Sequence, residues 1–186
     1  MSIGLKRGTV ELADYDPEWK NIAATTIEKL WRIFGDVAKD IQHIGSTSIK
    51  NIKAKPVIDI SVAVDDFSKV ERLTQKLESE GVLWGEWRND ERMLFFMISN
   101  PGIVTHFIHV VKVDSEEWFN FVNFRDYLNA NISVAKEYEE LKIKLADENS
   151  REPKWEKYTD GKHPFIEQTL ADVEIRKKQQ RSKNSK

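Results

Sequence analysis

Four features that would point to particular classes of protein are missing from this sequence: cysteine, a signal peptide, a long apolar run and an excess of positive charge. Without cysteine there is neither a disulfide framework nor a thiolate metal site. Without a leader or a spanning segment, we expect a cytoplasmic protein that does not enter a membrane. The 29 Lys and Arg residues are matched by 31 acids, so no basic field predicts binding to nucleic acid. Any anion that this protein binds must be held locally.

The composition predicts one domain followed by a tail. Of the 186 residues, 40% are hydrophobic, which is enough for one core and gives little reason to expect two. We place this single domain at residues 1–176. The last ten residues, KKQQRSKNSK at 177–186, contain no apolar side chain, and we predict a disordered basic tail there.

Helices and strands alternate in the first 111 residues. Asp16 and Pro17 are typical of a helix start, and apolar residues at helical spacing continue to about Gly35. Asp66 is placed to cap a second helix, and after Ser115 the whole pattern becomes helical. This order predicts an α/β fold with a helical C-terminal half. Strands are expected at 40–44, 56–64, 82–87, 93–98 and 104–111, and the later helices from 115, at 134–147 and from about 163.

A Gly-Ser turn precedes an acid that lies in an apolar strand. Gly45 and Ser46 follow the strand expected at 40–44, and Asp59 lies in the strand expected at 56–64. Glycine lets backbone N–H groups approach an anion closely, while a carboxylate on the returning strand supplies a hard oxygen ligand for a metal ion. A carboxylate among Val and Ile side chains is costly to bury without a partner, so we interpret Asp59 as a site residue.

The residues around the turn are candidates for phosphate binding. Thr47 and Ser48 add two hydroxyl groups to Gly45 and Ser46, which is more than a turn requires. These residues could also simply end the strand. Lys55 could reach a phosphate or could be a solvated charge in the loop, and both interpretations stay open.

Two arginines are further candidates for binding an anion. Arg92 follows a turn and precedes the strand expected at 93–98, so we expect it at the rim of a site, where its guanidinium could fork onto phosphate. Arg125 stands next to Asp126 on a predicted helix, which favours a structural pairing. Arg92 is therefore the preferred phosphate ligand of the two.

Three histidines lie close to these residues in the predicted sheet. In THFIHVV at 105–111, alternation along a strand sends His106 and His109 to opposite faces, so only one of them can serve the site. We favour His109, and the alternative is a hydrogen-bonded core histidine. His43 stands two residues before the turn and could join His109 and Asp59. Such a set would suit manganese, iron or zinc better than magnesium.

The Gly-Ser turn followed by Asp59 resembles the signature of the nucleotidyltransferase superfamily that includes DNA polymerase beta. That signature has a Gly-Gly or Gly-Ser turn and then two acids one residue apart on a strand, with a third acid commonly on an inner strand, where His109 is expected. Ser61 stands here at the position of the second acid, on the same face as Asp59. A hydroxyl is a weaker magnesium ligand than a carboxylate, so a two-metal transfer would lack a charge.

More of the chain resembles one branch of that superfamily, the GrpB family of bacterial proteins. The resemblance implies a nucleotidyltransferase-like fold, in which a mixed β-sheet is flanked by helices. It implies less about activity, because the members are grouped by fold and motif. A similar domain is fused behind dephospho-CoA kinase in some bacteria, which implies an accessory role as well. The blocks that carry the resemblance are YDPEW at 15–19, HIGSTS at 43–48, AKPVIDI at 54–60, ER at 91–92, THFIHVV at 105–111, FRDYL at 124–128 and the spaced Tyr158, Lys162 and Phe165.

The residues and the resemblance together leave two interpretations of function. The first is a metal-dependent nucleotidyltransferase that acts on a nucleotide or a phosphorylated small molecule, with Asp59 and His109 as catalytic residues and magnesium, manganese or zinc as the ion. The alternative is non-catalytic binding of a nucleotide or other phosphorylated ligand, or an accessory interaction domain whose protein partner is unknown. Ser61 argues against the first interpretation.

Overall fold

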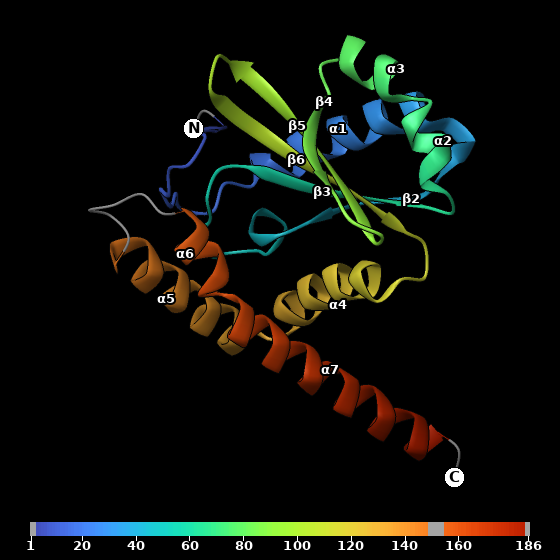
Figure 1. Cartoon of the computed structure of the whole chain (residues 1–186). Coiled ribbons are helices and arrows are strands. Elements are labelled where there is room, and N and C mark those ends of the chain that lie inside the picture. Colours follow the sequence, from blue (N-terminus) through green and yellow to red (C-terminus); the bar gives the residue numbers. More distant parts are fainter. Residues whose placement is uncertain (1–2, 149–154, 185–186) are drawn as a thin grey trace.

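The protein folds into a mixed sheet with helices on both faces (Figure 1). The structure, a computed structural model, describes residues 3–148 and 155–184. Within these residues the strand order is β2-β3-β6-β5-β4, and β1 pairs with β6. Strands β3 and β6 run parallel and the other pairs run antiparallel, which confirms the predicted mixed sheet. The strands are β1 (Leu5–Lys6), β2 (Ala38–Ile44), β3 (Ile58–Val64), β4 (Leu83–Arg88), β5 (Arg92–Asn100) and β6 (Ile103–Lys112).

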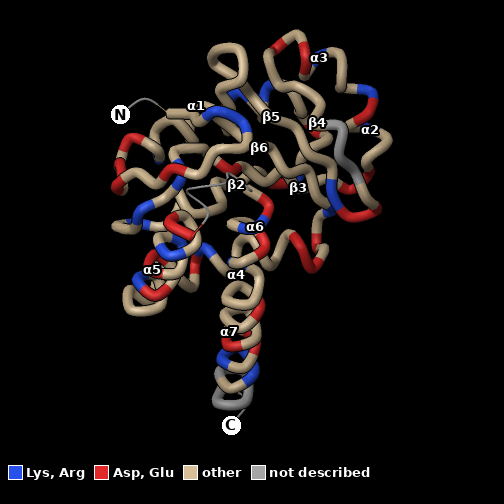
Figure 2. The backbone as a smooth tube through the Cα atoms, turned by 60° about the vertical axis from the view of Figure 1, so that its left-hand side comes forward, with Lys and Arg blue, Asp and Glu red and all other residues tan. Residues whose placement is uncertain are grey.

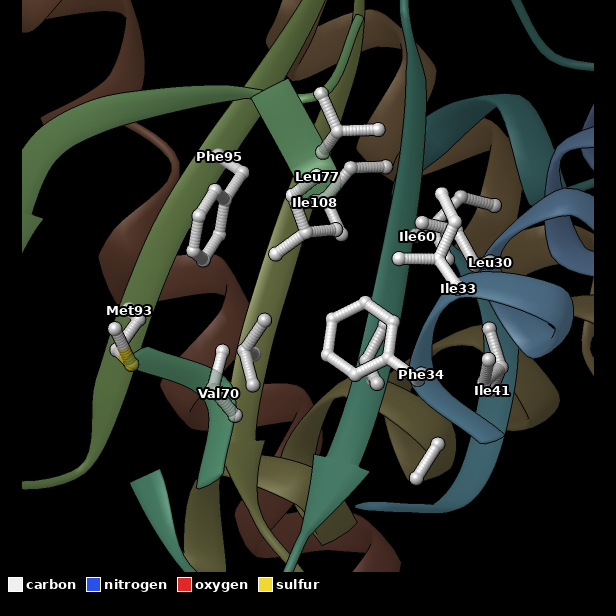
Figure 3. Packing of buried hydrophobic residues seen from close by; sticks show 14 of the residues in the cluster. Leu30, Ile33, Phe34, Ile41, Ile60, Val70, Leu77, Met93, Phe95 and Ile108 are labelled. Atoms are coloured by element: carbon white, nitrogen blue, oxygen red, sulfur yellow. The ribbon is translucent and has the colours of Figure 1, made fainter. Parts of the chain in front are cut away.

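The first face of the sheet carries the larger of the hydrophobic clusters. Leu30 and Phe34 belong to the same buried cluster as Ile60 of β3 and Ile108 of β6 (Figure 3). Burying each such side chain contributes about 1.5–3 kcal/mol, so this face holds the sheet in place. The helices that supply this side are α1 (Glu18–Phe34), α2 (Phe67–Glu71) and α3 (Thr74–Ser79).

Two predicted helix starts are confirmed by their capping side chains. The Asp16 carboxylate accepts the N–H of Glu18 at 2.9 Å, and the Asp66 carboxylate accepts the N–H of Ser68 at 2.8 Å. Helix α1 ends at Phe34 and is followed by Gly35, whose φ of 53° is disfavoured for other residues. The helix expected after Asp66 is divided into the short α2 and α3.

The second face is covered by the helical C-terminal half, as expected. Helix α4 packs against β2, β3 and β6, and its Trp118 clusters with Ala63 and Val111. A second core forms around Phe124 and Tyr138, whose rings meet edge to face at 5.2 Å. Figure 1 shows these helices on the side of the sheet away from α1. They are α4 (Glu116–Ala130), α5 (Ile132–Glu148), α6 (Trp155–Asp160) and α7 (His163–Asn184).

The end of α7 differs from the disordered tail expected at 177–186. The helix continues to Asn184 and extends beyond the rest of the molecule (Figure 1), while 185–186 lie outside the described residues. Lys, Gln and Arg favour helix, and extending an existing helix needs no new nucleus. Lys177 also donates a hydrogen bond to the Asn123 side chain of α4 at 3.0 Å. Low apolar content therefore did not prevent helix formation.

Positively and negatively charged residues are mixed along the chain, and neither sign dominates (Figure 2). Figure 2 shows basic and acidic residues interspersed on the sheet side and along α7. Within the described residues, no helix has both the length and the apolar character needed to cross a membrane.

Candidate functional site

Strand register brings Asp59, Ser61 and His109 together on the α4 side of the sheet. Ser61 of β3 is the register partner of His109 of β6, and Asp59 lies one pleat away on the same face. The Asp59 carboxylate and His109 Nε2 are 3.2 Å apart. His106 occupies the opposite face, where its ring bonds the Thr26 hydroxyl of α1 at 3.0 Å. The prediction that His109, and not His106, faces Asp59 is confirmed.

Gly45 lies directly against the Asp59 carboxylate. Its φ of 69° and ψ of −173° fall in a region that is essentially restricted to glycine. A Cβ atom added at Gly45 would stand 2.5 Å from Asp59 Oδ2 and 2.8 Å from Asp59 Cβ. Only a glycine fits at this point, so the sequence signal of a turn followed by an acid corresponds to a real contact.

The hydroxyl groups of the turn have separate partners. Ser46 Oγ lies 3.5 Å from the Tyr138 hydroxyl of α5, and Ser48 Oγ donates to the carbonyl oxygen of Gly45 at 2.5 Å. Thr47 is 3% exposed and bonds His43 Nε2 at 2.9 Å. Ser46 is therefore the hydroxyl nearest the helical half, while Thr47 and Ser48 stabilise the turn itself.

His43 does not join Asp59 and His109, which corrects the expected set of three ligands. In β2, His43 is the register partner of Ile60, whose side chain belongs to the core on the α1 side. Alternation therefore puts His43 on the opposite face from Asp59. Burial lowers the pKa of His43 to about 4, so its ring is neutral and serves as a hydrogen-bonding core group.

Two lysines from distant segments approach one aromatic ring near Asp59. The ammonium of Lys55, in the loop before β3, lies 5.8 Å from the centre of the Tyr158 ring. The ammonium of Lys162, between α6 and α7, lies 4.7 Å from the same ring. Burial lowers the pKa of Lys55, and Asp59 opposes that shift. Burial also lowers the pKa of Lys162 to about 8, and Lys55 adds to the effect.

A third lysine is buried in α5 beside this pair. Lys142 is fully buried; its ammonium donates to the carbonyl oxygen of Lys53 and lies 4.9 Å from the centre of the Tyr138 ring. Burial lowers the pKa of Lys142 to about 7, and the charge of Lys162 adds to that shift. Burial raises the pKa of Tyr138 to about 12. The site is therefore rich in cations on its helical side.

The two arginines are paired with side chains of the protein. Arg92 Nη1 and Glu117 Oε1 of α4 are 2.6 Å apart, so the charge of Arg92 is balanced before any ligand binds. Arg125 donates to the side chain of Gln42 and to the carbonyl oxygen of His43, each at 2.9 Å. The structural role expected for Arg125 is confirmed, and Arg92 lies on the Asp59 face as an ion-paired residue.

Two polar atoms beneath Asp59 are buried and make no hydrogen bond within the described part of the chain. They are Ser61 Oγ and His109 Nδ1, on adjacent strands. The His109 ring also lies against that of Phe121, with 5.4 Å between the ring centres. An unsatisfied buried polar group costs about 1–3 kcal/mol, so these atoms have unused capacity to bind a polar group.

The acidic and imidazole groups do not fit a two-metal site. Asp59 and His109 supply two ligands, and Ser61 supplies no charge at the position of the second acid. Among residues 3–148 and 155–184, no group of three or more His, Asp or Glu side chains converges closely enough to hold a metal ion. What these residues do assemble is one carboxylate, a glycine turn and several ammonium groups.

Two surface cavities lie away from Asp59. Their volumes are about 290 and 320 Å³, and neither is lined by Asp59, His109 or the lysines at Tyr158. The candidate site is therefore defined by the side chains that converge at Asp59. The first cavity is lined by Val10, Leu12, Lys53, Ile143, Ala146 and Asp147, and the second by Asp65, Asp66, Phe67, Ser68, Asp90 and Lys112.

Comparison with known proteins finds similarity to GrpB proteins along almost the whole chain. The family model described as "GrpB protein" matches residues 9–172. The glutamate-rich protein GrpB of Alkalihalophilus pseudofirmus is 35% identical over 175 residues, which cover 92% of this chain and 99% of that protein. The crystal structure of the conserved protein GrpB from Enterococcus faecalis superposes with a TM-score of 0.78 at 30% identity, covering 88% of this chain and 96% of that one.

A more distant structural likeness concerns the fold alone. The Cid1 poly(U) polymerase bound to MgGTP has a TM-score of 0.51 at 13% identity, over 72% of this chain and 43% of that chain. The sheet and its helices are therefore arranged as in a nucleotidyltransferase.

Proposed function

The chain belongs to the GrpB family, and from this premise we propose that it binds a nucleotide or another phosphorylated small molecule on the Asp59 face of its nucleotidyltransferase-like sheet. The observation that carries the proposal is that Asp59 lies against the Gly45 turn and also interacts electrostatically with Lys55. A phosphate needs both close approach to the backbone and positive charge, and these residues supply the two together.

Glycine makes the backbone of the turn accessible. A side chain at Gly45 would fill the space against Asp59, and the glycine instead leaves backbone near the carboxylate. Lys55 adds an ammonium group whose pKa is lowered. Burial lowers this pKa by more than the nearby charge of Asp59 raises it. Burial destabilises the charged form of such a lysine. A bound anion would stabilise it, because an opposite charge favours the ammonium form.

Binding is tested by calorimetric titration of the whole chain with the four nucleoside triphosphates and with phosphorylated coenzyme A precursors. Lys55→Met removes one charge-assisted hydrogen bond and should weaken binding roughly tenfold. Lys50→Met is the matched control, because Lys50 is an exposed lysine of the same loop. The proposal is wrong if none of these ligands binds to the wild-type protein.

Metal-dependent nucleotidyl transfer is the second candidate, favoured by the pairing of Asp59 with His109 on this fold. Asp59→Asn separates the two candidates by the sign of its effect. If the ligand binds without a metal, removing a negative charge beside the phosphate should strengthen binding. If a magnesium, manganese or zinc ion bridges Asp59 and the phosphate, the same substitution should abolish both metal-dependent binding and turnover. Asp36→Asn, in an exposed turn, is the control.

A further inference from the structure

Lys55 and Lys162 both approach the ring of Tyr158, although they come from segments far apart in the sequence. Their ammonium groups lie 5.8 and 4.7 Å from that ring centre. Tyr158 is 2% exposed, so it is a fixed platform within the helical half. The arrangement joins the loop before β3 to the connection between α6 and α7. Any ligand that touches both ammonium groups therefore binds to the sheet half and the helical half at once.

The charges around this pair are not balanced by acids. Within the described residues, neither ammonium makes a hydrogen bond or an ion pair, and Asp59 is the carboxylate that acts on both. Lys142 adds a third cation, whose charge interacts with that of Lys162. Glu139 is the carboxylate that acts on Lys142, so three lysines are set against two carboxylates in surroundings with little water. Like charges repel strongly there, since their interaction is weakly screened.

This imbalance indicates the charge of a ligand that would suit the two lysines. A single negative charge bound to Lys55 would leave Lys162 repelled by Lys142. A group with two or more negative charges would balance Lys55 and Lys162 together. A diphosphate has this charge and can bridge two ammonium groups. Ser46, whose hydroxyl reaches Tyr138 on the same helical side, extends this surface toward the glycine turn.

We propose that Lys55 and Lys162, positioned by Tyr158, together bind a diphosphate or longer polyphosphate group of the ligand. This inference rests on the proposed function, because it specifies the ligand of the same site. Lys162 is the residue that makes the helical half a part of the site. Lys142 is a positioning residue: its ammonium donates to the carbonyl oxygen of Lys53, and its charge interacts with that of Lys162.

The test is a calorimetric comparison of inorganic phosphate, pyrophosphate and tripolyphosphate, each titrated into the whole chain. Wild-type protein should bind pyrophosphate or tripolyphosphate at least about tenfold more tightly than phosphate. Lys162→Met should remove most of this preference, so that the affinities for phosphate and pyrophosphate become similar. Lys162→Arg should retain the preference, because it keeps the charge. Lys157→Met, an exposed lysine of α6, is the matched control and should behave as wild type.

The results that overturn the inference differ from those that overturn the proposed function. If Lys55→Met weakens ligand binding while Lys162→Met leaves the pyrophosphate preference unchanged, the inference is wrong and the function stands. A wild-type protein that binds phosphate and pyrophosphate equally also overturns the inference. Thermal unfolding of each variant identifies a loss of fold. If Lys162→Met is unfolded, the comparison of Lys162→Arg with wild type decides: a lost preference in a folded Arg variant refutes a role for the charge.

Discussion

Replacing Gly45 by alanine should destabilise the protein more than the same change at Gly35. Both glycines have positive φ and an extended or strained ψ, with values of 69° and −173° for Gly45 and 53° and −133° for Gly35. An alanine forced into such a conformation costs about 1–3 kcal/mol at either position. The backbone strain is therefore matched between the two variants.

The surroundings of the two glycines differ. A Cβ atom at Gly35 meets nothing within 4 Å, whereas one at Gly45 would lie 2.5, 2.8 and 2.9 Å from three atoms of Asp59. Ordinary contact begins at 3.4 Å, so Asp59 or the turn must move by about 1 Å. Asp59 lies in β3, an interior strand of the sheet, and overpacking of this kind costs about 1–3 kcal/mol. Gly45→Ala should therefore lose about 2–6 kcal/mol in total.

Urea unfolding at pH 7 measures the difference between the two variants. We expect the free energy of unfolding to fall about 1–3 kcal/mol further for Gly45→Ala than for Gly35→Ala, which corresponds to roughly 2–4 °C in melting temperature per kcal/mol. Gly45→Ala should also lose ligand affinity, and Gly35→Ala should keep it. Equal destabilisation, within about 0.5 kcal/mol, would refute the close contact between the turn and Asp59.

Three further predictions concern buried polar groups. His43 and His106 have pKa values lowered to about 4 by burial, so the unfolded chain binds more protons between about pH 4 and 6.5. The free energy of unfolding should therefore rise as pH rises through this window, and be lost as pH falls, by up to about 1.4 kcal/mol per pH unit for each ring. Urea unfolding at several pH values should show this slope, and His106→Asn should reduce it; an unchanged slope contradicts the account. Lys142, with a pKa near 7, has the same sign at higher pH: stability should rise from about pH 7 toward 10, and Lys142→Met should flatten that rise whereas the exposed Lys144→Met should not. Ser61→Ala removes a buried hydroxyl without a hydrogen bond, so without ligand it should leave the melting temperature unchanged or slightly raised, and a loss above about 1 kcal/mol would show that the hydroxyl has a partner.

The part of the site that strand alternation determines could be predicted from the sequence. Asp59, Ser61 and His109 share a face because side chains alternate along β3 and β6, and the neighbouring strands are in register. His43 was assigned wrongly, since its face depends on its pairing with Ile60, which sequence spacing before a turn does not give. The sequence of one strand shows which of its side chains share a face. Only the pairing of that strand with its neighbour shows which faces of the two strands lie on the same side of the sheet.

The cations of the helical half could not be assigned a role from local pattern. Lys142 and Lys162 lie in segments where lysines at helical spacing usually face solvent, and only packing against Tyr138 and Tyr158 buries them. Tyr158 and Lys162 belong to the residues that carry the family resemblance, which implies no role for them. The continuation of α7 to Asn184 does not follow from composition, because the tail has no apolar residue, although its Lys, Gln and Arg residues favour helix.

The most direct test of the central claim is a crystal structure of the protein soaked with a nucleoside triphosphate and manganese. The account predicts phosphate density within about 2.7–3.2 Å of the Gly45–Ser46 backbone and of the ammonium groups of Lys55 and Lys162. Density for the ligand at another surface, or none at a concentration that saturates the calorimetric titration, would contradict it.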